Sequence, residues 1–146
     1  MAKGNGGGVG GGRAAHGSEA AGHPASRRAN EASRDANAGG FSSKGEEAVA
    51  HAYAASAHSD AYTKTNGAAE HLASYKSHAE KSRQAAESAT RAAFGAKGAR
   101  AASLHSDAAV AHRAAAPYQA GGLAPGSQYL AQAAEHERMA KRFRPR

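Results

Sequence analysis

The chain has 146 residues, enough for one domain of ordinary size, and carries a net charge of +7. Its large aliphatic and phenyl side chains number only ten (three Val, four Leu and three Phe), whereas Ala occurs 42 times. Alanine favours helix strongly but buries little apolar area, so this composition predicts helices and excludes a deep core of large side chains. The absence of Cys excludes disulfides, thiolate metal sites and cysteine nucleophiles.

We therefore expect an all-α protein, built as an antiparallel helical hairpin or a small bundle with alanine seams and preceded by a disordered Gly-rich arm. The expected divisions are a flexible Gly/Ala-rich arm (1–25), a short helix and linker (26–40), a helical hairpin or bundle core (41–116), a Gly/Pro loop (117–126) and a C-terminal helix with a basic tail (127–146).

The first expected helix covers residues 27–37. Ser26, which follows Pro24, is its candidate N-cap, and Gly39 with Gly40 ends it, because glycine readily adopts the conformation that follows a helix. A helix of about three turns is marginal alone, so we expect this one to need packing partners.

The second expected helix, 44–64, has the clearest start. Ser43 and Glu46 have the S-x-x-E spacing of a capping box, which satisfies free N–H groups at a helix N-terminus. Asn66 and Gly67 supply the left-handed residues of a tight turn at its other end. The sequence thus predicts a helix followed by a sharp reversal.

Three further helices follow. The third covers about 68–94 and stops near Gly95. The fourth covers about 99–116 and ends before Pro117, because the residue preceding proline is disfavoured in helical conformation. The last covers about 127–143.

Small residues at alternating spacings of four and three give the third helix a coiled-coil seam. It runs through Ala68, Leu72, Tyr75, Ala79, Ser82, Ala86, Ala89 and Ala93. The same register in the second helix passes through Ala48, Ala52, Ala55, Ser59 and Tyr62, and in the fourth through Ala101, Leu104, Ala108, Ala111 and Ala115. Seams of such short side chains predict a close approach of the helices.

Six of the nine histidines form pairs seven residues apart, so that each pair lies on one helix face. The pairs are His51 with His58, His71 with His78, and His105 with His112. In an antiparallel hairpin of the second and third helices, the residue numbers of any two facing residues add to a nearly constant value. The numbers of His51 and His78 have the same sum as those of His58 and His71. The sequence therefore predicts that His51 faces His78 and that His58 faces His71.

Three interpretations fit these facing histidines. The weak candidates for ligands of Zn, Ni or Cu are His51, His58, His71 and His78. Each facing pair supplies only two imidazoles, however, which is fewer than the three or four ligands of a zinc site. They could instead form a pH switch, neutral above a pKa near 6.5 and mutually repelling below it. The pattern favours a third role, in which histidine is a medium-sized filler between alanine helices. We expect no cofactor.

Basic residues gather at the C-terminus. Arg138, Lys141, Arg142, Arg144 and Arg146 fall within the last nine residues. Such a cluster can contact nucleic-acid phosphates without sequence specificity, or it can be a solvated tail with no dedicated partner.

The chain lacks the motifs of common enzymes. No phosphate-binding loop, H-E-x-x-H, G-x-S-x-G or calcium loop occurs, so we expect no catalytic activity. No run of about 18 apolar residues predicts a membrane span, and no secretory signal is recognisable at the N-terminus. A cytoplasmic or virion-associated protein without membrane contact is the expectation.

The segments ANEASRDAN, AVAHAYAASAH, AEHLASYKSHAEK and YLAQAAEHERMAKRF are rich in Ala, and AVAHAYAASAH has the pattern A-x-x-H-x-x-A-x-x-x-H. Through these segments residues 26–143 resemble a loose class of uncharacterised Ala/His-rich helical proteins of bacterial and bacteriophage genomes, in which such a helix is repeated around short Gly-containing turns. We hypothesise a structural or assembly component, such as part of a phage particle or bacterial assembly, that forms homo-oligomers or binds other structural subunits. The alternative is a basic accessory protein that binds nucleic acid.

Overall fold

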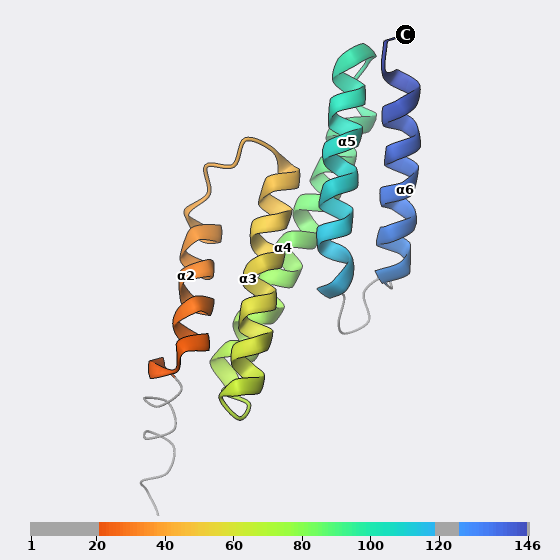
Figure 1. The fold of residues 1–146 in the computed structure, drawn as a ribbon. Helices are drawn as coiled ribbons and strands as arrows, with labels where there is room; N and C mark the ends of the chain where they lie inside the picture. Colours follow the sequence, from red (N-terminus) through yellow and green to blue (C-terminus); the bar gives the residue numbers. More distant parts are fainter. Residues whose placement is uncertain (1–20, 119–125, 146) are drawn as a thin grey trace, which may run out of the picture.

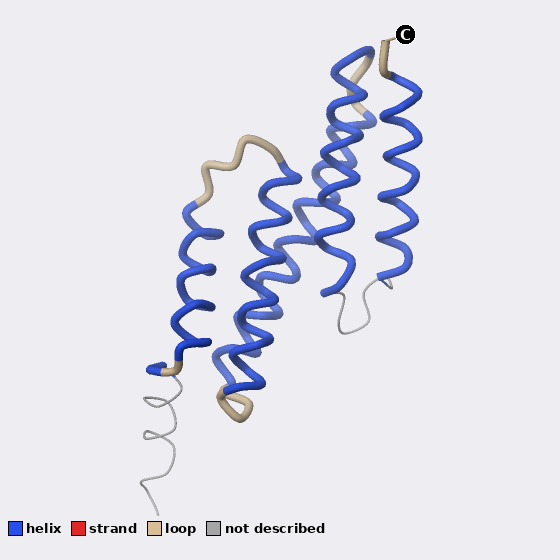
Figure 2. The backbone as a smooth tube through the Cα atoms, in the orientation of Figure 1, coloured by secondary structure: helices blue, strands red, loops and turns tan. Residues whose placement is uncertain are grey.

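The computed structural model describes residues 21–118 and 126–145, and all regular structure in these segments is helical (Figures 1 and 2). The elements are α2 (Pro24–Ala38), α3 (Lys44–Lys64), α4 (Ala69–Phe94), α5 (Gly98–Ala115), a short 3-10 turn η1 (Ala116–Tyr118) and α6 (Gly126–Phe143). The all-α prediction is confirmed. Most of the predicted arm lies outside the described residues, and its last two residues belong to α2.

The start of α2 corrects one prediction. The N-cap is His23, whose Nδ1 accepts the N–H of Ala25 at 3.1 Å, so the helix begins at Pro24 and Ser26 is not the cap. Proline suits the first helical position because its missing N–H would have no partner there. The helix ends at Gly39, which has a φ of 71°.

The predicted boundaries of α3 are confirmed. The Ser43 side chain accepts the N–H of Glu46 at 3.1 Å, and the Glu46 carboxylate accepts the N–H of Ser42 rather than that of Ser43. At the other end Asn66 and Gly67 have φ values of 54° and 83°, the left-handed conformation that turns the chain back into α4. α3 and α4 thus form the predicted antiparallel hairpin.

The 26-residue helix α4 joins two groups of helices (Figure 1). Its first half packs with α3, and α2 packs mainly on α3 and also contacts α4. Its second half packs with α5, which pairs with α6. α3 also contacts α5 directly, and there the N–H of Gly45 bonds to both carboxylate oxygens of Asp107 at 3.0 and 3.1 Å. No described helix is long and apolar enough to cross a membrane.

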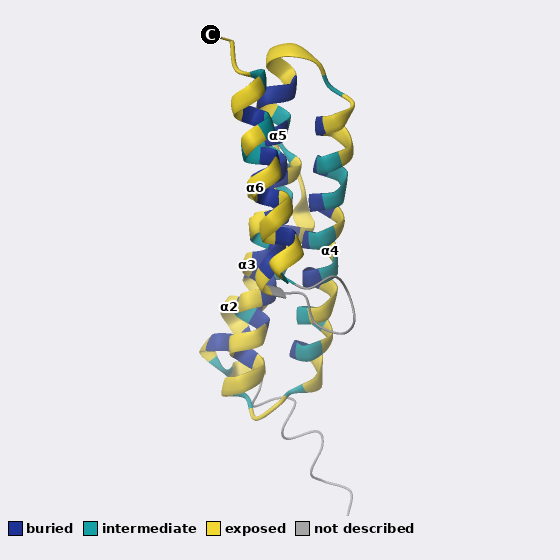
Figure 3. Cartoon of the chain, turned by 90° about the vertical axis from the view of Figure 1, so that its right-hand side faces the viewer, coloured by how far each residue is buried: buried dark blue, intermediate teal, exposed yellow. Residues whose placement is uncertain are grey.

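The buried helix faces meet along the axis of the bundle (Figure 3). They consist mainly of Ala, and the largest fully buried side chains are those of His58, His71 and His105. Buried seam positions that the sequence predicted correctly are Ala48, Ala52, Ala55, Ala79, Ser82, Ala86, Ala89, Ala93, Ala101, Ala108, Ala111 and Ala115.

Six predicted seam positions are not fully buried. Ser59 and Tyr62 are exposed, and Ala68, Leu72, Tyr75 and Leu104 are only half-buried. The reason is that histidine occupies the interior: the true seam passes through His58 in α3 and through His71 and His78 in α4. These histidines lie inside the core.

Candidate functional site: two histidine–hydroxyl clusters

Four histidines of α3 and α4 form the first cluster. Nδ1 of His51 lies 2.8 Å from Nδ1 of His78, and Nδ1 of His58 lies 2.9 Å from Nδ1 of His71. All four side chains are at most 5% exposed. The predicted register of facing pairs is therefore confirmed, at hydrogen-bonding distance.

Helix α2 supplies two hydroxyl groups that the hairpin alone does not have. Ser33 Oγ lies 2.6 Å from Nε2 of His58 and 2.8 Å from Nε2 of His78, so one hydroxyl bridges both pairs. Ser26 Oγ lies 2.7 Å from Nε2 of His71. The result is one continuous hydrogen-bonded chain, in the order His51, His78, Ser33, His58, His71, Ser26.

All the hydrogen bonds in this series of six side chains can form when every member is neutral. Five hydrogen bonds link its six members, each bond needs one hydrogen, and every neutral imidazole or hydroxyl carries one. An added proton would place a charged imidazolium beside rings that already share their hydrogens in a buried site. The geometry therefore fits the neutral form of all four rings.

Burial also lowers the pKa values of His51, His58 and His78. It is the main cause for His51, where the charge of Lys81 adds to the effect and Glu47 opposes it, and for His58, where His71 adds to it. Burial together with the charges of His51, His58 and Lys81 lowers the pKa of His78 to about 4. His51 also lines a surface pocket of about 670 Å³, so protons from solvent can reach the hydrogen-bonded series at its His51 end.

A second cluster joins α4, α5 and α6. Nδ1 of His105 lies 2.7 Å from Nδ1 of His136, and Thr90 Oγ1 lies 3.1 Å from Nε2 of His136 and 2.7 Å from Nε2 of His112. The order is His105, His136, Thr90, His112. Burial lowers the pKa of His105 and of His112, and burial with the charges of His112 and His105 lowers that of His136 to about 4.

The second cluster repeats the arrangement of facing rings and a bridging hydroxyl with two side chains changed. Thr90 takes the place of Ser33, and the seven-residue pairs of α5 and α6 take the places of those of α3 and α4. Tyr129 precedes His136 by seven residues as His71 precedes His78, and its ring lies beside that of His112, with centroids 5.6 Å apart. Among buried side-chain N and O atoms of the described residues, only Nδ1 of His112 has no hydrogen-bond partner.

Sequence reasoning found part of this site. It paired the four histidines of the hairpin, but it gave His136 no partner and overlooked the hydroxyl groups. The spacings of seven residues between Ser26 and Ser33 and between Tyr129 and His136 are signals that could have revealed both. The described residues contain no group of three or more His, Asp or Glu side chains placed to hold one metal ion.

The predicted basic tail lies at the C-terminal end of α6 and beyond it. Arg138 pairs with Glu135, whereas Lys141, Arg142 and Arg144 are exposed without an ion pair in the described part of the chain. Arg146 lies outside the described residues.

Comparison of the chain with protein-family models, curated proteins and solved structures finds no match.

Proposed function

We propose that the protein is a non-enzymatic structural component, a helical scaffold that is packed through neutral buried histidines and opens when acidified. The observation that carries this proposal is that histidines are the largest fully buried side chains in a core otherwise made mainly of alanine. Space that leucine or phenylalanine fills in most bundles is filled here by titratable rings. The stability of the packing is thereby tied to their protonation.

The sign of this dependence follows from linkage. Six histidines (51, 58, 78, 105, 112 and 136) have folded pKa values below the unfolded value near 6.5. The unfolded chain therefore binds more protons below about pH 6.5, and the free energy of unfolding falls as pH falls. A histidine with a folded pKa of about 4, such as His78 or His136, contributes a slope of up to about 1.4 kcal/mol per pH unit between that value and 6.5. These two histidines alone approach a slope of about 3 kcal/mol per pH unit, a substantial part of the stability of an ordinary domain.

Few charges near the clusters offset this effect. Glu47 faces His51 and Glu135 faces His136, but Lys81 acts in the opposite sense on both His51 and His78. No carboxylate of the described residues is hydrogen-bonded to a clustered imidazole, and the serine and threonine partners carry no charge. An extra proton in either cluster thus lacks a close counter-ion.

The thin core and an exposed apolar groove support a role in assembly. Val49 and Tyr53 of α3 and Val110 of α5 are 46%, 66% and 45% exposed and line one groove between these helices. Packing of further copies or other structural subunits would bury this surface. The resemblance to Ala/His-rich proteins of bacterial and phage genomes suggests a phage particle or bacterial assembly as the setting.

Sedimentation and circular dichroism at pH 7.5 and pH 5 test the proposal. We expect self-association at pH 7.5, and loss of defined tertiary packing at pH 5. A variant with Gln at His51, His58, His71 and His78 should lose less stability on acidification, because only the second cluster still titrates. A monomer whose unfolding free energy is equal at both pH values would overturn the proposal. A monomer that is acid-sensitive would overturn its assembly part alone.

A further inference from the structure

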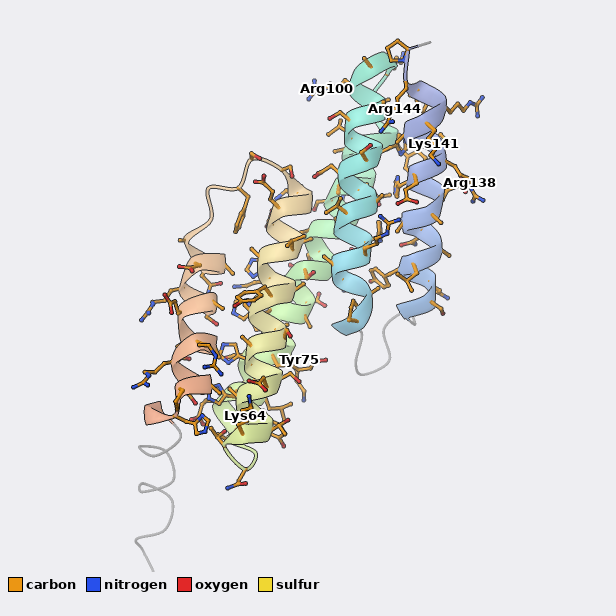
Figure 4. The ribbon with its side chains drawn as sticks, viewed as in Figure 1. Lys64, Tyr75, Arg100, Arg138, Lys141 and Arg144 are labelled. Atoms are coloured by element: carbon orange, nitrogen blue, oxygen red, sulfur yellow. The ribbon has the colours of Figure 1, made fainter. Side chains whose placement is uncertain are left out.

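Positive charge is concentrated at one end of the bundle, where the C-terminus of α4, the N-terminus of α5 and the C-terminus of α6 meet (Figure 4). Phe94 at the end of α4 and Phe143 at the end of α6 both contact the ring of His105 of α5. Segments 88–104 and 139–145 contain six basic residues and no acidic one. We call these six residues the basic end: Arg91, Lys97, Arg100, Lys141, Arg142 and Arg144.

The rest of the described chain is almost neutral. It contains ten basic and eleven acidic residues, a net charge of −1 against +6 for the basic end. All six side chains of the basic end are exposed, and none forms an ion pair within the described residues. The acidic residues of α6 lie further along the helix, where Glu135 pairs with Arg138 and Glu137 pairs with Arg113.

We propose that the basic end binds nucleic acid through its phosphate backbone. Four of its six residues are arginines, whose planar guanidinium groups bind phosphate in bidentate fashion. Two of the basic residues, Lys97 and Arg100, lie at the N-terminus of α5, where the helix dipole adds positive potential that the C-terminal ends of α4 and α6 oppose.

The tail seen in the sequence is therefore only half of this surface. Lys97, Arg100 and Arg91 join it through the packing of α4 and α5 against α6. The phenyl rings at this end are those of Phe94, which is 61% exposed, and Phe143, which is half-buried, and both contact His105. Two rings are a much smaller apolar face than the one that an amphipathic helix inserts into a membrane. Phosphate contacts without base contacts also imply binding that does not depend on nucleotide sequence.

The salt dependence of binding is a direct measure of this surface. Neutralising six phosphates gives a slope of about −5 in log affinity against log salt on duplex DNA. We expect the affinity for a short labelled duplex to fall roughly a thousandfold between about 50 and 200 mM salt. Fluorescence anisotropy on the full chain at pH 7.5 measures it, so the result does not depend on the acid response of the histidine clusters.

Two variants with the same change in net charge locate the site. The first replaces Arg100, Lys141 and Arg142 with Gln, and the matched control replaces Arg27, Arg34 and Lys76, which are exposed residues of α2 and the first half of α4. The first variant should reduce the magnitude of the salt slope by about 3, and the control should leave it unchanged.

Equal effects of the two variants would overturn the proposal, because net charge alone would then explain binding. Tighter binding to phosphatidylserine vesicles than to the duplex at the same salt concentration would also overturn it and assign the basic end to a membrane surface. Circular dichroism of both variants establishes that they retain the helical fold of the parent chain.

Discussion

Nδ1 of His58 lies 2.9 Å from Nδ1 of His71 across the seam between α3 and α4. Two imidazoles meet in this way only when one donates and the other accepts, so at least one of the facing nitrogens must be deprotonated. The pair specifies the register of the hairpin, since a shift of one residue in either helix would turn one of the rings out of the core. It also makes the packing sensitive to acid.

Stability should fall steeply as pH falls. Urea unfolding followed at pH 8, 7, 6 and 5 should give an unfolding free energy that is nearly constant above about pH 7 and declines below about 6.5, towards the folded pKa of about 4 for His78 and His136. Replacing His51, His58, His71 and His78 with Gln should flatten the decline and spare helicity at pH 8. A stability that rises between pH 7 and pH 5 would contradict this prediction.

Loss of the bridging hydroxyl should be costly. Ser33→Ala leaves Nε2 of His58 and Nε2 of His78 without their shared partner, and an unpaired buried polar group costs about 1–3 kcal/mol. We expect a loss of about 2 kcal/mol in unfolding free energy at pH 8. Ser59→Ala, at an exposed position of α3, is the control and should change stability by less than about 0.5 kcal/mol. Equal effects of the two substitutions would argue against the bridge.

Two buried histidines should respond differently to the same substitution. His58→Leu leaves the buried His71 ring without its partner and removes one bond of Ser33. His112→Leu removes one bond of Thr90, which keeps its bond to His136, together with the one buried nitrogen of the described residues that has no partner. Chemical denaturation at pH 8 should show a loss of about 2 kcal/mol for His58→Leu and a smaller loss for His112→Leu. A larger loss for His112→Leu than for His58→Leu would contradict the assignment of stronger hydrogen bonding to His58 than to His112.

An added methyl group at Gly45 should separate α3 from α5. A Cβ there would lie 2.2 Å from Oδ1 of Asp107 and 3.0 Å from its backbone oxygen, so the carboxylate would have to leave the N–H that it accepts. Alanine is favoured over glycine in a helix by about 1 kcal/mol. Thermal denaturation should nevertheless show that Gly45→Ala lowers the free energy of unfolding by about 1–3 kcal/mol, because the added methyl group overpacks the contact. Gly22→Ala, where the Cβ meets open space, is the control. A Gly45→Ala protein as stable as the parent would show that the helices can move apart freely.

The helices and the hairpin could be read from the sequence because their signals are local. The Ser43 cap acts within three residues of itself, and the Asn66–Gly67 turn acts within one helix end. Once the turn is placed, the seven-residue spacing of the histidines leaves one register in which two pairs face each other. This is why the contacts of His51 with His78 and of His58 with His71 could be predicted.

The tertiary structure decided the rest, because alanine is so frequent that many helix faces could pack equally well. The seven-residue spacings place Ser33 and His136 on particular helix faces, but they do not identify the two rings, 25 and 45 residues away, that Ser33 bridges, or His105 as the partner of His136. These contacts exist because α4 is shared, packing with α2 and α3 at one end and with α5 and α6 at the other. The sequence by itself determined the helices and the facing histidines of the α3–α4 hairpin, whereas the packing of distant helices completed both buried clusters.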